Sequence, residues 1–357
     1  MYSLSSGSPL LLLWGHLKVF DEFTKRGITD RHPDAILADM REALGNPPIL
    51  LVDNWPIVPP MVVVASHEVA EQVSRPSKNS QYSVPKLPSV DRIVDLIGPN
   101  SILLKQNEKW KPVRKKFNPG FAPQHLMTVL PVIIEKTRPY LEVIDGFVST
   151  GEELALDQPT TNLTFDVTGA VTMGEDMSAQ NLDACRQGQL TVMVKELIKN
   201  VESLTPEIME ETCDQLKTFL FAGHDSTSPT IIWSMYELFV REKLLAPEGD
   251  ELVNRMPYIS AVIKEAMRLH PPAGSIRMAE PGAEFVVFTP QGEYNLDGKW
   301  TYLNHSIIHR DRAVFGDRAD DFVPERWLQS DGAGGYPAKC LEAIREGPKE
   351  LYWQGAG

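Results

Sequence analysis

Residues 222–227 read Ala-Gly-His-Asp-Ser-Thr and lie in the middle of a helical pattern longer than an average helix. The pattern begins at Thr205-Pro206-Glu207, where a capping hydroxyl precedes a proline at the first helical position. Apolar residues then recur at helical spacing to about Arg241. Pro229 lacks an amide hydrogen and crowds the carbonyl four residues earlier, so it predicts a kink or a widened turn beside the hexapeptide.

A disturbed helical turn leaves a carbonyl without its partner and makes room for water or a small ligand. Asp225, beside the hydroxyls of Ser226 and Thr227, could pass protons into such a gap. The same residues would also suit a solvated patch on an ordinary helix. Taken alone, the hexapeptide leaves both interpretations open.

Composition narrows the class of protein. The chain has 357 residues, of which 48 are acidic and 35 basic, for a net charge of −13. This balance, without a basic block, argues against a nucleic-acid binder. A hydrophobic share of 42% predicts a globular chain with one large domain or two ordinary ones. Because Cys185, Cys213 and Cys340 are widely spaced, we expect neither a disulfide framework nor a zinc site, and a reducing, intracellular compartment fits.

Periodicity predicts a mostly helical chain with a small β portion. The predicted helices span 33–44, 126–144, 163–173 and 257–269, a basic stretch covers 107–117, and the predicted strands span 49–52, 61–64 and 284–289. The apolar run Pro9 to Trp14 is too short to cross a bilayer, which takes about 20 apolar residues, and it lacks the flanks of a signal peptide. We expect it to begin the folded body.

Two elements in the second half of the chain predict a buried ionic cluster. Glu265 and Arg268 are three residues apart on one helix, so they share a face and can pair, as many surface pairs do. Arg326 follows in Phe322-Val323-Pro324-Glu325-Arg326-Trp327 and can bind a carboxylate with its guanidinium fork. The three residues could form a triad that acts as a structural lock.

Taken in order, these segments resemble the cytochrome P450 family, the haem-thiolate monooxygenases. Residues 222–227 resemble the family's oxygen-activation segment, residues 265–268 its Glu-x-x-Arg element and residues 322–327 its Pro-Glu-Arg element. The resemblance covers the chain from about residue 15 to Leu328. Within the family, the chain is similar to filamentous-fungal microsomal members. It implies a mainly α fold with small β-sheets, an incomplete cytochrome P450 fold, with one domain over 1–328 and an aberrant tail over 329–357.

The resemblance also implies a site with haem b and its iron. Trp110 and Arg114 match a helix that faces a haem propionate, and Arg277 matches another propionate-binding arginine. Ala222 and Gly223 match positions beside the cofactor. Asp225 and Ser226, with Thr227 next to them, match the proton relay to iron-bound dioxygen. The family usually has threonine at Ser226, and serine keeps the hydroxyl but loses the methyl that fixes its rotamer.

Partners and location follow from the same resemblance. It implies an NADPH-dependent P450 reductase, an apolar small-molecule substrate, no nucleic acid, and a role in fungal secondary metabolism. Members of the family sit on the endoplasmic reticulum membrane. This sequence shows no transmembrane anchor, so we expect a cytoplasmic location for the chain itself.

The family's haem-ligand loop, Phe-x-x-Gly-x-Arg-x-Cys-x-Gly, is not found. Cys340 lies in the corresponding region, but its neighbours 336–342 do not match, which leaves it a weak candidate for the metal ligand. If the reading frame over residues 340–353 is shifted by one base, the codons that these residues permit can encode the complete loop, including the ligand cysteine. We therefore hypothesise that the tail, starting between Leu328 and Cys340, is out of frame, and the nucleotide sequence tests this.

Three functional hypotheses remain. The first is an active haem-dependent monooxygenase, and the second is a chain of the same lineage that cannot ligate haem through cysteine and is inactive. The third, a purely structural helical protein, would make three ordered motifs a coincidence. Stretches after Met177 and after Leu244 are also short for the family. The sequence indicates neither the substrate nor the particular reductase.

Overall fold

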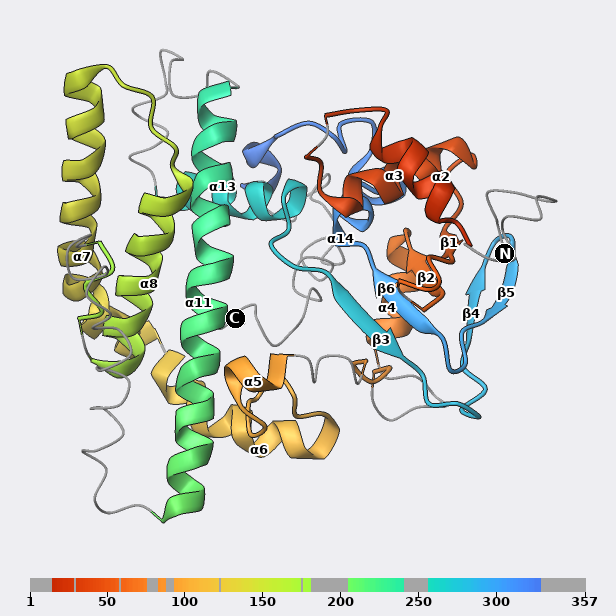
Figure 1. Ribbon diagram of the computed structural model, residues 1–357, viewed down its shortest axis with the longest axis horizontal. Coiled ribbons are helices and arrows are strands. Elements are labelled where there is room, and N and C mark those ends of the chain that lie inside the picture. The colour runs from red at the N-terminus through yellow and green to blue at the C-terminus, as the bar shows by residue number, and fades with distance from the viewer. Residues whose placement is uncertain are drawn as a thin grey trace. The chain divides into compact units, whose positions relative to one another are not determined.

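The computed structural model describes residues 15–28, 30–57, 59–75, 83–87, 93–121, 123–174, 176–180, 205–240 and 256–328. They form two compact units (Figure 1), the first from the described parts of 1–88 and 247–352 and the second from those of 89–246. Helices predominate beside small sheets, which confirms the predicted fold class. The single domain over 1–328 stays a prediction, and the tail 329–357 lies outside the described residues.

A four-stranded sheet organises the first unit. Its strand order is β1-β2-β6-β3, with β2 and β6 parallel and the other neighbours antiparallel. The strands are β1 (Ile49–Val52), β2 (Met61–Val64), β6 (Trp300–Leu303) and β3 (Ser275–Met278). The predicted pairing of the first two strands is confirmed, with Ile49 opposite Val64. A separate hairpin joins β4 (Val286–Thr289) to β5 (Gly292–Asn295), which confirms the strand predicted there.

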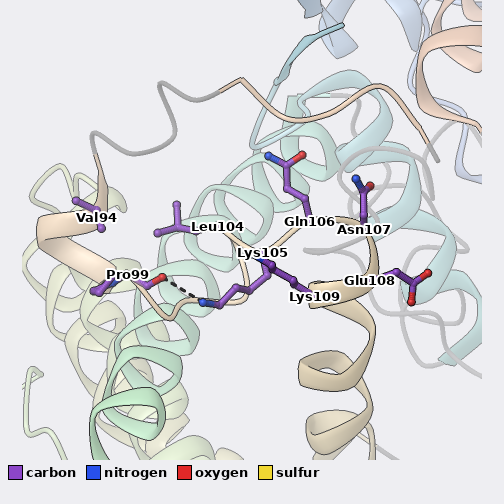
Figure 2. Close-up of a pocket in the computed structure, with 8 residues that line it drawn as sticks. All are labelled: Val94, Pro99, Leu104, Lys105, Gln106, Asn107, Glu108 and Lys109. Carbon is purple, nitrogen blue, oxygen red and sulfur yellow. Dashed lines mark hydrogen bonds between the residues drawn. The ribbon is translucent and has the colours of Figure 1, made fainter. Parts of the chain in front are cut away.

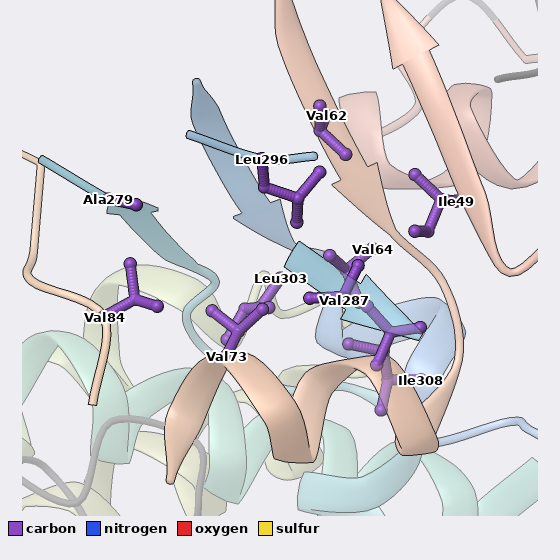
Figure 3. Close-up of a cluster of buried hydrophobic side chains, with 11 residues drawn as sticks. Ile49, Val62, Val64, Val73, Val84, Ala279, Val287, Leu296, Leu303 and Ile308 are labelled. Atoms are coloured by element: carbon purple, nitrogen blue, oxygen red, sulfur yellow. The ribbon is translucent and has the colours of Figure 1, made fainter. Parts of the chain in front are cut away.

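Branched aliphatic side chains fill the core between this sheet, the hairpin and neighbouring helices (Figure 3). Such residues pack well on a pleated surface because their rotamers are restricted. Residues from distant parts of the sequence meet there: Ile49, Val62, Val64, Val69, Val73, Val84, Ala279, Val287, Leu296, Leu303 and Ile308. The core therefore joins the N-terminal strands to the segment after residue 256.

Helices surround the sheet within the first unit. The helix predicted at Pro33 runs over Pro33–Ala43, and proline occupies its first position, where the amide has no helical partner. The helical elements are α2 (Leu17–Thr24), α3 (Pro33–Ala43), α4 (His67–Ser74), α13 (Met256–Leu269), α14 (His305–Ile308), α15 (Arg312–Phe315) and the 3-10 turn η3 (Pro324–Trp327).

The second unit is helical in its described part. Three long helices lie side by side in Figure 1, and the unit comprises α5 (Val94–Ile97), α6 (Asn107–Phe117), η2 (Asn118–Phe121), α7 (Pro123–Thr150), α8 (Asp157–Met173) and α11 (Pro206–Val240). The predicted start of α11 is confirmed, because the amide of Ile208 donates to Thr205 Oγ1 at 3.4 Å. The helix continues through Pro229 as α-helix, so the structure does not show the widened turn expected there, and the kink stays a prediction.

Candidate active site

The structure brings Glu265, Arg268 and Arg326 into one buried cluster. Arg268 binds Glu265 with both arms of its guanidinium, Nε to Oε2 and Nη2 to Oε1, each at 2.9 Å. Arg326 Nε donates to Glu265 Oε1 at 3.0 Å. The side chains of Glu265 and Arg268 are 0% exposed and that of Arg326 is 2% exposed. Helix α13 supplies the first two residues and η3 the third, from segments about sixty positions apart.

Two guanidinium groups have more N–H donors than one carboxylate can accept. Backbone carbonyls therefore accept the remaining hydrogen bonds. Arg268 donates to the carbonyls of His309, Ala319 and Asp321 at 2.8, 2.6 and 2.9 Å. The ring of Phe315 lies under its guanidinium at 4.8 Å. A buried ion pair stabilises only where hydrogen bonds replace the lost water, and these carbonyls do so. The cluster acts as a structural lock between α13 and the segment 309–327.

Sequence reasoning missed the role of Trp327. Its indole nitrogen donates to Glu265 Oε2 at 2.9 Å, and the amide of Val323 donates to Oε1 at 2.8 Å. Glu265 therefore accepts five hydrogen bonds within the described residues. The available signal was the indole itself, because a buried tryptophan needs an acceptor for its N–H.

The hexapeptide occupies the middle of α11. Ser226 is half-buried, and its hydroxyl donates to the carbonyl of Ala222 at 2.7 Å, one turn earlier. Asp225 and Thr227 are exposed. His224 Nδ1 lies 2.7 Å from the carbonyl of Leu220, so this nitrogen carries the hydrogen, because a carbonyl only accepts. The carboxyl and hydroxyl expected to relay protons are adjacent, on one turn of helix.

The packing of α11 against α8 requires a glycine at position 223, which the sequence alone did not indicate. A Cβ added there would lie 2.7 Å from Cγ2 of Thr168 on α8. The backbone of α11 therefore lies close to the Thr168 side chain of α8 at the hexapeptide, and glycine makes this approach possible. Gly223 therefore weakens the helix, as expected, but a larger residue there would clash with Thr168.

Trp110 and Arg114 lie on α6, one turn apart and on one face. The indole nitrogen of Trp110 is buried and has no hydrogen-bond partner among the residues that the structure describes. A buried donor left unpaired costs about 1–3 kcal/mol, so this site favours an added acceptor such as a carboxylate.

A hollow of about 640 Å³ lies beside the start of α6. Figure 2 shows the residues that line it: Val94, Pro99, Leu104, Lys105, Gln106, Asn107, Glu108 and Lys109. No residue proposed for the site lines that hollow.

Arg277 belongs to the first unit, on β3, and is 8% exposed. Its Nε donates to Ser275 Oγ at 3.1 Å and its Nη1 to the carbonyl of Val84 at 3.3 Å. His305 lies nearby, with Nδ1 2.9 Å from the carbonyl of Ala273. Burial lowers the pKa of His305 and the charge of Arg277 adds to this effect, whereas the hydrogen bond to Ala273 and the charge of Asp34 oppose it.

The predicted residues thus fall into separate groups. Asp225, Ser226, Thr227, Ala222 and Gly223 share α11, and Trp110 with Arg114 shares α6 in the same unit, whereas the triad and Arg277 belong to the other unit. Of the three cysteines, Cys213 on α11 is described and has a free thiol. Cys185 and Cys340 lie outside the described residues, as does the tail 329–357.

These features define a class of mainly helical protein in which a Glu-x-x-Arg pair closes on an arginine from a later Pro-Glu-Arg turn. The family model for cytochrome P450 matches residues 48–209 and 183–341. The chain belongs to the cytochrome P450 family, whose cofactor is haem.

The chain is similar to several fungal proteins of this family. It is 27% identical to cytochrome P450 monooxygenase acrF of Aspergillus aculeatus, over 84% of this chain and 75% of the relative. It is 22% identical to cytochrome P450 monooxygenase polC of Polytolypa hystricis, over 81% of this chain and 66% of the relative. A bifunctional cytochrome P450/NADPH-P450 reductase of Fusarium oxysporum is 31% identical over 38% of this chain and 14% of its own length.

Among the described residues, Trp110 suits the edge of a haem group. Trp110 supplies a buried donor that needs an acceptor, and a propionate is a carboxylate. The position expected for the axial ligand lies in the tail, outside the described residues. Among the helices that the structure describes, none combines the length and the apolar character needed to cross a bilayer.

Proposed function

We propose that this chain derives from a haem-dependent monooxygenase that inserts one oxygen atom of dioxygen into an apolar small molecule. The observation that carries the proposal is the buried ionic lock of Glu265, Arg268 and Arg326, in a chain of the cytochrome P450 family that also retains Asp225 and Ser226 on α11. When bound, haem supplies the reactive iron centre for dioxygen.

The protein's own residues would bind and orient the cofactor and move protons. Trp110, Arg114 and Arg277 would hold the propionates by charge-assisted hydrogen bonds. Ala222 would leave space beside the cofactor, because its side chain is small, and Gly223, whose Cβ position is filled by Thr168, would approach the cofactor through its backbone alone. Asp225 and Ser226, with Thr227 adjacent, would take protons from solvent toward the reacting oxygen. The exposure of Asp225 supports this direction, since an exposed carboxyl exchanges protons with water.

Electrons would come from an NADPH-dependent P450 reductase. The relatives named as bifunctional cytochrome P450/NADPH-P450 reductases carry both functions by name, which supports this class of partner. The relatives named as cytochrome P450 monooxygenases come from fungi, and we extend the proposal to a role in fungal secondary metabolism. We extend the same argument to a setting on the endoplasmic reticulum membrane.

A second candidate function is that of an inactive chain of the same lineage, which the absence of the Phe-x-x-Gly-x-Arg-x-Cys-x-Gly loop favours. The domain 1–328 would then keep the fold without ligating haem through cysteine. The two candidates share the lock and the α11 segment, so they differ only in the axial ligand. Cys340 is the residue on which they disagree.

The carbon monoxide difference spectrum of the purified, reduced protein separates the candidates. A Soret band at the thiolate-specific position would reject the inactive chain, whereas purification without haem would reject the enzyme. The Cys340→Ser variant should abolish that band if Cys340 is the ligand. The matched Cys213→Ser variant changes a free thiol on α11 and should leave the spectrum intact.

A further inference from the structure

Three threonines of α8 face the hexapeptide of α11. Thr161, Thr164 and Thr168 are spaced three and four residues apart, so they share one side of the helix. The hydroxyls of Thr161 and Ser228 are 3.0 Å apart. Thr164 Oγ1 lies 3.2 Å from the carbonyl of His224 and 3.0 Å from that of Thr161, so its hydrogen is shared between them.

The contacts run in opposite order along the two helices, which are therefore antiparallel here. Thr161 meets Ser228, Thr164 meets His224, and the methyl of Thr168 lies against Gly223. Thr164 is 3% exposed and Ser228 is 2% exposed, so water does not compete for these hydrogen bonds. All of the contacts lie inside the second unit.

This turn of α11 is short of backbone hydrogen bonds. Pro229 has no amide hydrogen, so the carbonyl of Asp225 lacks the partner that a regular helix provides. The hydroxyls of Ser226 and Thr230 donate to carbonyls four residues earlier, so both side chains bond within α11 itself. Hydroxyl groups from α8 then hold the turn from outside, on both sides of Asp225.

We propose that Thr161 and Thr164 are positioning residues, which hold the turn of α11 that carries Asp225 and Ser226. The inference rests on the proposed function, because the relay gives the position of that turn its importance. Neither threonine belongs to the proposed proton relay. Each acts through α11, by fixing the backbone at His224 and the side chain of Ser228.

Amide hydrogen exchange of the full chain tests the proposal without haem. Thr164→Val keeps the shape and removes the hydroxyl, and we expect exchange of the amides of residues 226–228 and 230 to rise roughly five-fold, as the loss of one hydrogen bond implies. Thr164→Ser keeps the hydroxyl and should restore the rate. Thr172→Val is the matched control, because the hydroxyl of Thr172 donates at 2.6 Å to a carbonyl of α8 itself.

The results separate positioning from general loosening. Unchanged exchange at residues 226–228 and 230 in Thr164→Val, or an equal rise in Thr172→Val, would overturn the proposal. If Thr164→Val does not fold, Thr161→Val supplies the same test through its contact with Ser228. Haem titration of the unmodified chain tests the proposed function separately, so failure to bind haem would leave the exchange result interpretable.

Discussion

The indole nitrogen of Trp327 lies 2.9 Å from Oε2 of Glu265, on the oxygen that also accepts from Arg268 Nε. The contact adds a neutral donor to a carboxylate already bound by two guanidinium groups. Because Trp327 and Arg326 come from the same 3-10 turn, both fix that turn to α13. Glu265 is the acceptor of the lock. Apart from Arg268, its donors all come from the short segment 323–327.

Glu265→Gln should destabilise the first unit strongly. The substitution leaves Arg268 and Arg326 buried without a counter-charge, and breaking a buried pair in this way costs about 3–5 kcal/mol. Urea denaturation measures the loss of unfolding free energy. The control is Arg318→Gln, which removes an exposed pair with Asp321 and should change stability by no more than about 1 kcal/mol. Equal effects of both substitutions would contradict the role given to Glu265.

Gly223→Ala should destabilise the second unit although alanine favours helices. The added methyl would lie 2.7 Å from Cγ2 of Thr168, and such overpacking costs about 1–3 kcal/mol. Gly146→Ala on α7 is the matched control, because nothing lies within 4 Å of its added Cβ. There we expect a gain of about 0.5–1 kcal/mol from helix propensity alone. Thermal unfolding compares them, and stabilisation by both would refute the close approach.

Alkaline pH should lower the free energy of unfolding of the first unit through the contact between Tyr302 and Asp34. Tyr302 donates to Asp34 Oδ1 at 2.7 Å, and burial, with help from this carboxylate, raises the pKa of Tyr302. A raised folded pKa stabilises the protein below the unfolded value of 10.0, and the stability is lost as the pH rises above it. Denaturation from pH 9 to 11 should show a slope of up to about 1.4 kcal/mol per pH unit that Tyr302→Phe removes. An unchanged slope in the variant would argue against it.

Acid should weaken the first unit through His305. Its ring is buried and its pKa is lowered by burial, so the unfolded chain binds a proton more readily than the folded chain. Unfolding free energy should therefore fall as the pH drops below the unfolded pKa of 6.5. Asp34 opposes the shift and Arg277 supports it. His305→Gln should flatten this part of the pH profile, and a variant as acid-sensitive as the parent would count against the effect.

Local patterns were sufficient for much of the fold. Thr205 and Pro206 predicted the start of α11, and the structure confirms it, because capping depends on neighbouring residues. Strand periodicity likewise predicted the pairing of β1 with β2. It did not indicate that β2 lies parallel to β6, since Met61 and Trp300 are too far apart in the chain for any local signal.

The sequence by itself determined the family, the order of its motifs and the residues that could form the lock and the relay, because these depend on residue type and spacing. Only the tertiary structure decided that Trp327 completes the shell of Glu265 and that Thr164 reaches the carbonyl of His224. Both contacts join segments about sixty residues apart. A side-chain donor or a backbone carbonyl can pair with many groups, so the residue type does not indicate its partner. The partner depends on which segments pack together.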